Sequence, residues 1–195
     1  MKRAAPCVVA LALLLGCDQS KSTTAAPSRV EAIRARSSDD SAASFCDVAP
    51  ARAAAPTFSF PKLEGPAPLD VKGPRWINLW ATWCPPCIEE LPRLKQLVAE
   101  LKSAGSAVSL QLVSLDSTAG ALDAFAKNHV EAAGSPRLSD PMALEAWLTS
   151  IGLDKGATLP VHIFVGGDGK VLCARTGAIR DSDLPAIKKL LASAP

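Results

Sequence analysis

The chain has 195 residues, with 21 basic and 19 acidic side chains, a formal net charge of +2 and 48% hydrophobic residues. This length suits one domain with additional segments. The near balance of charge, without a basic stripe, excludes the electrostatic footprint of a nucleic-acid-binding protein.

The first residues are typical of an export signal. Lys2 and Arg3 precede an apolar run over residues 4–15, which is short for a membrane span. The run ends in Leu-Leu-Gly-Cys17, which resembles a bacterial lipobox. We therefore expect residues 1–16 to be a lipoprotein signal peptide and Cys17 to carry lipid; the alternative is an ordinary secretory signal with a chance cysteine. Without the signal, 19 basic and 19 acidic side chains remain.

Residues 17–56 are rich in Ser, Ala, Thr, Arg and Asp and show little apolar periodicity. Such a composition buries too little surface to offset the entropy lost on folding. We interpret this segment as a flexible tether that holds a domain of residues 57–195 away from a membrane; the alternative is a domain that already starts near Phe45.

Strand and helix patterns alternate within residues 57–195. The apolar run at 75–80 is typical of a buried central strand. Leucines at helical spacing follow between residues 88 and 101. The other expected elements are a short strand at 57–60, a strand at 107–115, helices at 121–130 and 140–151, strands at 161–165 and 171–175 around a Gly-Gly-Asp-Gly turn, and a final helix over 184–191.

The most informative motif is Trp83-Cys84-Pro85-Pro86-Cys87, at the start of the first predicted helix. A Cys-X-X-Cys pair at a helix N-terminus suits reversible thiol–disulfide chemistry. The positive end of the helix dipole favours a thiolate, so we expect an exposed Cys84 to attack targets with a pKa below the usual thiol value of about 8.5. Cys87, one turn inward, would then resolve the mixed disulfide.

Among the other cysteines, Cys7 lies within the signal peptide. An oxidising compartment favours a structural disulfide between Cys46 and Cys173 over two unrelated buried thiols. A zinc site at Cys84 and Cys87 would need two more ligands, and the chain has no second Cys-X-X-Cys or His pair. We therefore expect no metal and no cofactor.

The element order and the Trp-Cys-X-X-Cys motif resemble the thioredoxin superfamily. The phrase from Ile77 to Cys87 is similar to its membrane-anchored, extracytoplasmic TlpA/ResA branch. Over residues 57–192 this resemblance implies an α/β thioredoxin-like fold, a central mixed β-sheet flanked by helices, with an N-terminal extension. It also implies reduction of protein disulfides in cytochrome c maturation or copper-centre assembly, with electrons from a membrane thiol transporter of the DsbD or CcdA type.

The resemblance also assigns roles to single residues. Glu90 matches a glutamate near the cysteines that would exchange a proton with Cys87; the alternative is a solvated helix charge. Pro160 matches a cis-proline that faces the cysteines, and with the Leu159 backbone it would hold the substrate strand. Trp83 would shield the disulfide.

Three positions near these residues carry further expectations. Asn78 stands where cytosolic thioredoxins have a buried aspartate, and we expect a satisfied polar group of the core. Val161 and His162 depart from the small polar residues that the branch usually has after the cis-proline. We expect His162 to be a strand residue without a chemical role.

The sequence thus predicts a lipid-anchored thiol–disulfide oxidoreductase facing the periplasm. Asp18, which follows the lipid-bearing cysteine, favours the inner membrane. The alternative is a copper(I)-delivery or non-catalytic interaction module, in which Cys84 and Cys87 serve as soft thiolate ligands. Met142 is the only methionine after the signal, which argues against a methionine-rich copper site.

Overall fold

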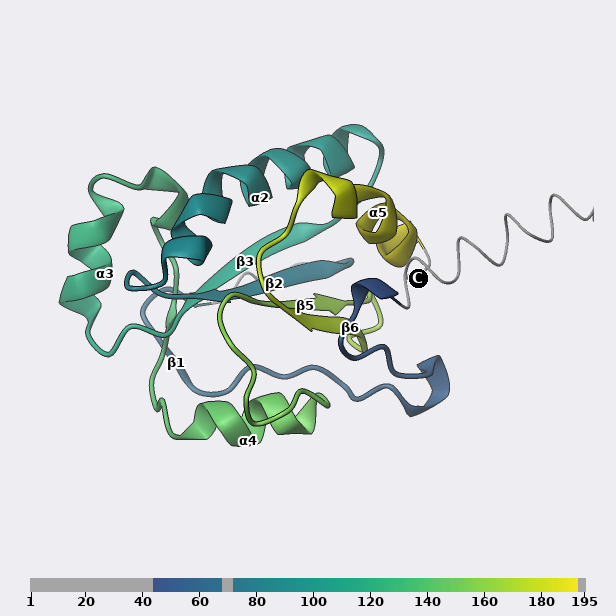
Figure 1. The fold of residues 1–195 in the computed structure, drawn as a ribbon, viewed down its shortest axis with the longest axis horizontal. Helices are drawn as coiled ribbons and strands as arrows, with labels where there is room; N and C mark the ends of the chain where they lie inside the picture. Colours follow the sequence, from purple (N-terminus) through teal and green to yellow (C-terminus); the bar gives the residue numbers. More distant parts are fainter. Residues whose placement is uncertain (1–43, 68–71, 193–195) are drawn as a thin grey trace, which may run out of the picture.

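Figure 1 shows a central β-sheet with helices on both of its faces. The computed structural model describes residues 44–67 and 72–192. Its strands are β1 (Leu63–Glu64), β2 (Arg75–Trp80), β3 (Ser109–Ser114), β4 (Arg137–Leu138), β5 (Val161–Val165) and β6 (Val171–Thr176). Its helices are α2 (Pro85–Ser103), α3 (Ala119–Ala126), α4 (Ala143–Ser150) and α5 (Leu184–Ala192), with 3-10 turns η1 (Arg52–Ala54), η2 (Val130–Ala132) and η3 (Asp181–Asp183).

β2 lies at the centre of the sheet. The strand order is β1-β4-β3-β2-β5-β6, and β2 runs parallel to β3 and antiparallel to β5. Five consecutive residues of β2 are buried, as expected for a strand covered on both faces. The sheet is therefore mixed.

The side chains of β2 alternate between two core layers. Trp76 and Trp80 belong to the layer beneath α2 and α5, whereas Ile77 and Leu79 pack with Trp147 of α4. Figure 1 shows the same division, with α2 and α5 above the sheet and α4 below it. This alternation decides which strand residues can meet side chains of α2.

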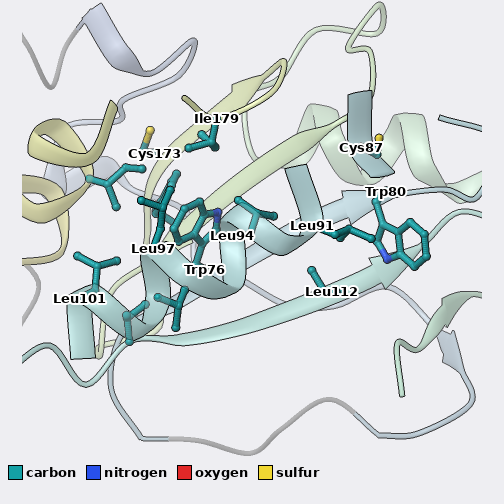
Figure 2. Packing of buried hydrophobic residues seen from close by; sticks show 14 of the residues in the cluster. Trp76, Trp80, Cys87, Leu91, Leu94, Leu97, Leu101, Leu112, Cys173 and Ile179 are labelled. Atoms are coloured by element: carbon teal, nitrogen blue, oxygen red, sulfur yellow. The ribbon is translucent and has the colours of Figure 1, made fainter. Parts of the chain in front are cut away.

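α2 begins directly after the first cysteine of the motif. Pro85 occupies the first turn, where its missing N–H is harmless. The helix continues through Pro92, and Gly105, with a φ of +90°, follows its end. Figure 2 shows the buried face of α2, with Leu94 and Leu97 beside Trp76 and Leu91 beside Trp80.

The contacts of residues 44–56 support the alternative start of the domain near Phe45 over a start at residue 57. Phe45 is buried against Phe164, with ring centroids 5.7 Å apart. Val48 and Ala174 exchange two backbone hydrogen bonds of 2.9 Å. A few isolated anchors attach this segment, so apolar periodicity could not reveal it.

Other differences concern short elements. β1 and β4 have two residues each, too few for a recognisable alternation, and were not predicted. Residues 57–60 contribute one isolated bridge, between Thr57 and Lys170, rather than a strand. The helix expected at 121–130 already ends at Ala126, and a 3-10 turn follows.

The predicted signal peptide, the lipid-bearing Cys17 and the tether up to residue 43 lie outside the described residues. Within the described ranges, no helix combines the length and the apolar character needed to cross a bilayer. The fold described here therefore concerns the domain that carries the cysteine motif.

Candidate active site

Cys84 and Cys87 lie where β2 passes into α2, and a disulfide joins them with Cα atoms 5.3 Å apart. The backbone N–H of Cys84 donates to the carbonyl of Ala81 over 3.1 Å, which closes the turn before the helix. Cys84 is the N-cap residue of α2. The positive end of the helix dipole therefore lies at this sulfur and favours a thiolate once the bond is reduced.

Cys84 is less accessible than its motif predicted. Its exposed fraction is 5% and that of Cys87 is 0%, which corrects the expectation of an exposed first thiol. Cys84 forms part of the wall of an apolar hollow of about 570 Å³. A target disulfide must therefore enter this hollow to reach Cys84.

Two of the residues predicted to bind substrate line the same hollow as Cys84. Trp83 lines the same hollow and is 65% exposed, so its large aromatic surface is open to solvent. Leu159 also lines the hollow, and the Leu159–Pro160 peptide bond is cis. The Pro160 carbonyl accepts a hydrogen bond of 2.9 Å from the N–H of Gly177, so its place at the start of β5 is held by the chain beyond β6.

Glu90 is a buried carboxylate, so the alternative of a solvated helix charge is wrong. Its exposed fraction is 1%. Oε1 accepts a hydrogen bond of 2.9 Å from Nδ2 of Asn78, and Oε2 accepts one of 2.9 Å from the backbone N–H of Ile179. Glu90 follows Cys87 by one turn on the buried side of α2. Donors on both oxygens fix the position of this carboxylate.

A second buried titratable group lies beside Glu90. His162 is fully buried in β5 and pairs with Asn78 of β2 across the sheet. The indole Nε1 of Trp76 donates to Nδ1 of His162 over 3.1 Å, and Nε2 lies 3.4 Å from Oε1 of Glu90. Directly opposite residues of antiparallel strands project to one face. The side chain of His162 therefore lies on the face of the sheet that α2 covers and contacts Glu90, a contact that the sequence did not predict.

Asp116 anchors the loop that leads to Cys84, and sequence reasoning missed it as well. Its exposed fraction is 2%. The carboxylate accepts hydrogen bonds from the backbone N–H of Thr82 at 3.1 Å and from the hydroxyls of Thr82 and Ser114 at 2.6 Å each. The available signal was a polar residue just after the strand expected at 107–115. Its partner Thr82 lies 34 positions earlier, which no local pattern reveals.

A second disulfide joins Cys46 and Cys173, which are 127 residues apart, with Cα atoms separated by 5.6 Å. Cys173 is fully buried in β6. Figure 2 shows Cys87 and Cys173 at opposite ends of the cluster under α2. This bridge therefore ties residue 46 to the sheet at a distance from the cysteine pair of the motif.

Across residues 44–67 and 72–192, no group of three or more His, Cys, Asp or Glu side chains is arranged to hold a metal ion. The two histidines of the chain contact different residues. His162 meets Trp76 and Glu90, whereas His129 stacks on Phe125 with ring centroids 3.9 Å apart.

A family model described as Redoxin matches residues 50–191. The chain belongs to the Redoxin family. The match begins before residue 57, in agreement with the ordered segment that precedes β1. It contains the cysteine pair, Glu90 and Pro160 of this Redoxin-family protein.

This Redoxin-family chain is 33% identical over 121 residues to "Thiol-disulfide oxidoreductase ResA" of Bacillus thuringiensis (strain Al Hakam), covering 60% of the chain and 65% of the relative. It is 32% identical over 130 residues to "Thiol:disulfide interchange protein DsbE homolog" of Paracoccus denitrificans, covering 62% and 63%. The chain thus spans less than two thirds of the length of either relative. These matches and the family model confirm the resemblance to TlpA/ResA-type members of the thioredoxin superfamily.

Among solved structures, the chain is similar to a secreted thiol-disulfide isomerase from Corynebacterium glutamicum. The TM-score is 0.53 at 18% identity, and the match covers 75% of this chain and 92% of the other. Likeness at this identity concerns the fold alone. With the mixed sheet and its flanking helices, it confirms the predicted thioredoxin-like α/β fold of this Redoxin-family chain.

Proposed function

We propose that this protein is a protein-disulfide reductase that exchanges thiols and disulfides through Cys84 and Cys87. The observation that supports this most strongly is the disulfide between them, at the N-terminus of α2 and in the wall of an apolar hollow. A disulfide in such a position can be broken and re-formed by a visiting protein. The chemistry named in both relatives supports the same proposal.

In the reduced enzyme, Cys84 is the nucleophile. Its thiolate attacks one sulfur of a target disulfide, and a mixed disulfide forms between Cys84 and the target. The other target sulfur leaves as a thiolate and takes a proton from solvent. The N-terminus of α2 stabilises the attacking thiolate by about 0.3–1 kcal/mol, the usual contribution of a helix end.

Cys87 completes the exchange. Its thiolate attacks the sulfur of Cys84, the Cys84–Cys87 disulfide re-forms, and the second target sulfur is released. Two electrons have then passed from the enzyme to the target. Because Cys87 is fully buried, its proton needs an acceptor inside the protein. Glu90, one turn further along α2, is that acceptor in our proposal.

The target approaches through the hollow beside Cys84. Trp83 packs against the polypeptide around the target disulfide and shields the reacting sulfurs. The backbone of Leu159, held next to Pro160, pairs with an extended segment of the target by β-type hydrogen bonds. The apolar lining of the hollow favours an apolar side chain beside the target cysteine.

We place the enzyme outside the cytoplasm, with a lipid on Cys17 anchoring it to the periplasmic side of the inner membrane. A membrane thiol transporter of the DsbD or CcdA type returns electrons to the Cys84–Cys87 pair. The targets are protein disulfides in cytochrome c maturation or copper-centre assembly. A palmitate label on the full chain that disappears in Cys17→Ala tests the anchor; a label that persists there contradicts it.

Reduction of insulin disulfides by the purified protein, with dithiothreitol as electron source, tests the activity. We expect the wild type to accelerate precipitation of insulin and Cys84→Ser to lose this effect. The matched control is Cys46→Ala with Cys173→Ala, which keeps the motif and should stay active below its unfolding temperature. An inert wild type that binds copper(I) tightly contradicts the proposal and favours the copper carrier. A reduction potential near about −120 mV, as in strong oxidants, contradicts the direction of electron flow.

A further inference from the structure

His162 is a buried imidazole that the exchange reaction described above does not use. It is fully buried in β5, on the face of the sheet that α2 covers. Three polar side chains surround its ring: the Trp76 indole, the Asn78 amide and the Glu90 carboxylate. The donors and acceptors around a buried ring determine which ring nitrogen carries the N–H.

Two N–H donors face Nδ1 of His162. Nε1 of Trp76 donates over 3.1 Å, and Nδ2 of Asn78 lies at 3.4 Å. A ring nitrogen that accepts a hydrogen bond carries no proton of its own, so the proton of the neutral ring is on Nε2. The ring therefore presents an Nε2–H donor.

This Nε2–H faces Glu90. Nε2 lies 3.4 Å from Oε1 of Glu90, although the angle keeps it short of an aligned hydrogen bond within the described residues. A buried N–H donor without an acceptor is costly, and Oε1 of Glu90 is an acceptor within reach of Nε2. His162 and Asn78 thus both contact the same oxygen of Glu90.

We propose that His162 is a positioning residue, whose Nε2–H holds Glu90 where its carboxylate exchanges a proton with Cys87. This inference rests on the proposed redox function. The proton that leaves Cys87 passes to Glu90, and His162 acts through its Nε2–H hydrogen bond while Nδ1 accepts from Trp76. The hydrogen bond from the Trp76 indole fixes the orientation of the His162 ring, and the Nε2–H of that ring fixes the position of the Glu90 carboxylate.

The test uses the reduced full chain and 5,5′-dithiobis(2-nitrobenzoate), followed by absorbance in a stopped-flow instrument. Cys84 attacks the reagent, forms a mixed disulfide and releases one thionitrobenzoate. Cys87 then attacks Cys84, forms the intramolecular disulfide and releases a second thionitrobenzoate. The rate of the second release measures the step that Glu90 and His162 serve, separately from the attack by Cys84.

We expect Glu90→Gln to slow the second release about 100-fold, the lower end of the effect of a general base. His162→Asn retains a polar group but is too short to reach Glu90, and it should slow this release about tenfold, as expected for a lost hydrogen bond to a charged group. His162→Gln extends an amide donor to the place of Nε2 and should restore most of the rate. In the Glu90→Gln background, His162→Asn should add no further slowing.

Ile163→Ala is the matched control, because Ile163 is buried in the same strand but faces the other core layer. It should lower stability and leave the second release unchanged. A wild-type rate in His162→Asn, or equal slowing with and without the Glu90→Gln change, would overturn the proposal. If His162→Asn does not fold, Trp76→Phe, which removes the indole donor, tests the same coupling to Glu90 by the same criteria.

The outcomes also separate this inference from the proposed function. A wild type that releases no second thionitrobenzoate refutes exchange through Cys84 and Cys87, and the role of His162 with it. A wild type that releases both equivalents, with Glu90→Gln slow and His162→Asn unchanged, refutes the role of His162 alone.

Discussion

Replacing Cys46 and Cys173 together by alanine should remove about 5 kcal/mol from the free energy of unfolding. The bridge closes a loop of 127 residues. The loop-closure entropy of a cross-linked unfolded chain of that length corresponds to about 5 kcal/mol at 25 °C. This is a large part of the 5–15 kcal/mol that is typical of whole domains.

The loss acts mainly through the unfolded chain, because other contacts hold the first described residues on the sheet. Phe45 remains buried beside Phe164. The carboxylate of Asp47 accepts hydrogen bonds of 2.7 and 2.8 Å from the backbone and hydroxyl of Thr176. The native fold should therefore persist in the double variant, whose unfolded chain has a higher conformational entropy than that of the wild type.

Guanidinium chloride unfolding measures this loss. Both proteins are kept with the Cys84–Cys87 disulfide intact, which thiol counting verifies. In a separate thermal unfolding experiment, the midpoint temperature should fall by about 10–20 °C, because each kcal/mol of lost stability shifts the midpoint of a domain of this size by about 2–4 °C. A loss below about 1 kcal/mol would refute the chain-entropy argument for this bridge.

Two further predictions concern the loop before Cys84 and the core beneath α2. Asp116→Ala leaves the Thr82 donors without their acceptor, so we expect the free energy of unfolding to fall by about 2–3 kcal/mol and insulin reduction to slow. The control Asp123→Ala, on the exposed side of α3, should change neither. An unfolding midpoint of Asp116→Ala equal to that of the wild type would contradict the anchoring role of Asp116. Leu94→Ala, at a fully buried position, should cost about 3–5 kcal/mol in chemical unfolding, against less than about 0.5 kcal/mol for exposed Val130→Ala. A small loss at Leu94 would contradict the packing of α2 on the sheet.

Local patterns predicted the parts of the site that lie close together in the chain. The strand at 75–80 and the helix after it follow from apolar runs and spacing, and the motif places Cys84 and Cys87 at their junction. The resemblance added the cis-proline at 160 and a glutamate at 90. Composition left the start of the domain open between Phe45 and residue 57, because Phe45 and Val48 are single anchors in a segment that otherwise looks like a tether.

The sequence alone determined which atoms carry the chemistry, because the spacing of Cys84 and Cys87 and the helix after them depend on neighbours within a few residues. Only the tertiary structure decided the environment of those atoms. It covered Cys84 within a hollow and buried Glu90 against Ile179, 89 positions away, and near His162. Such contacts depend on strand register and on the face to which each side chain projects. A polar residue in an apolar strand becomes part of the site only when the folded chain brings a buried carboxylate against it.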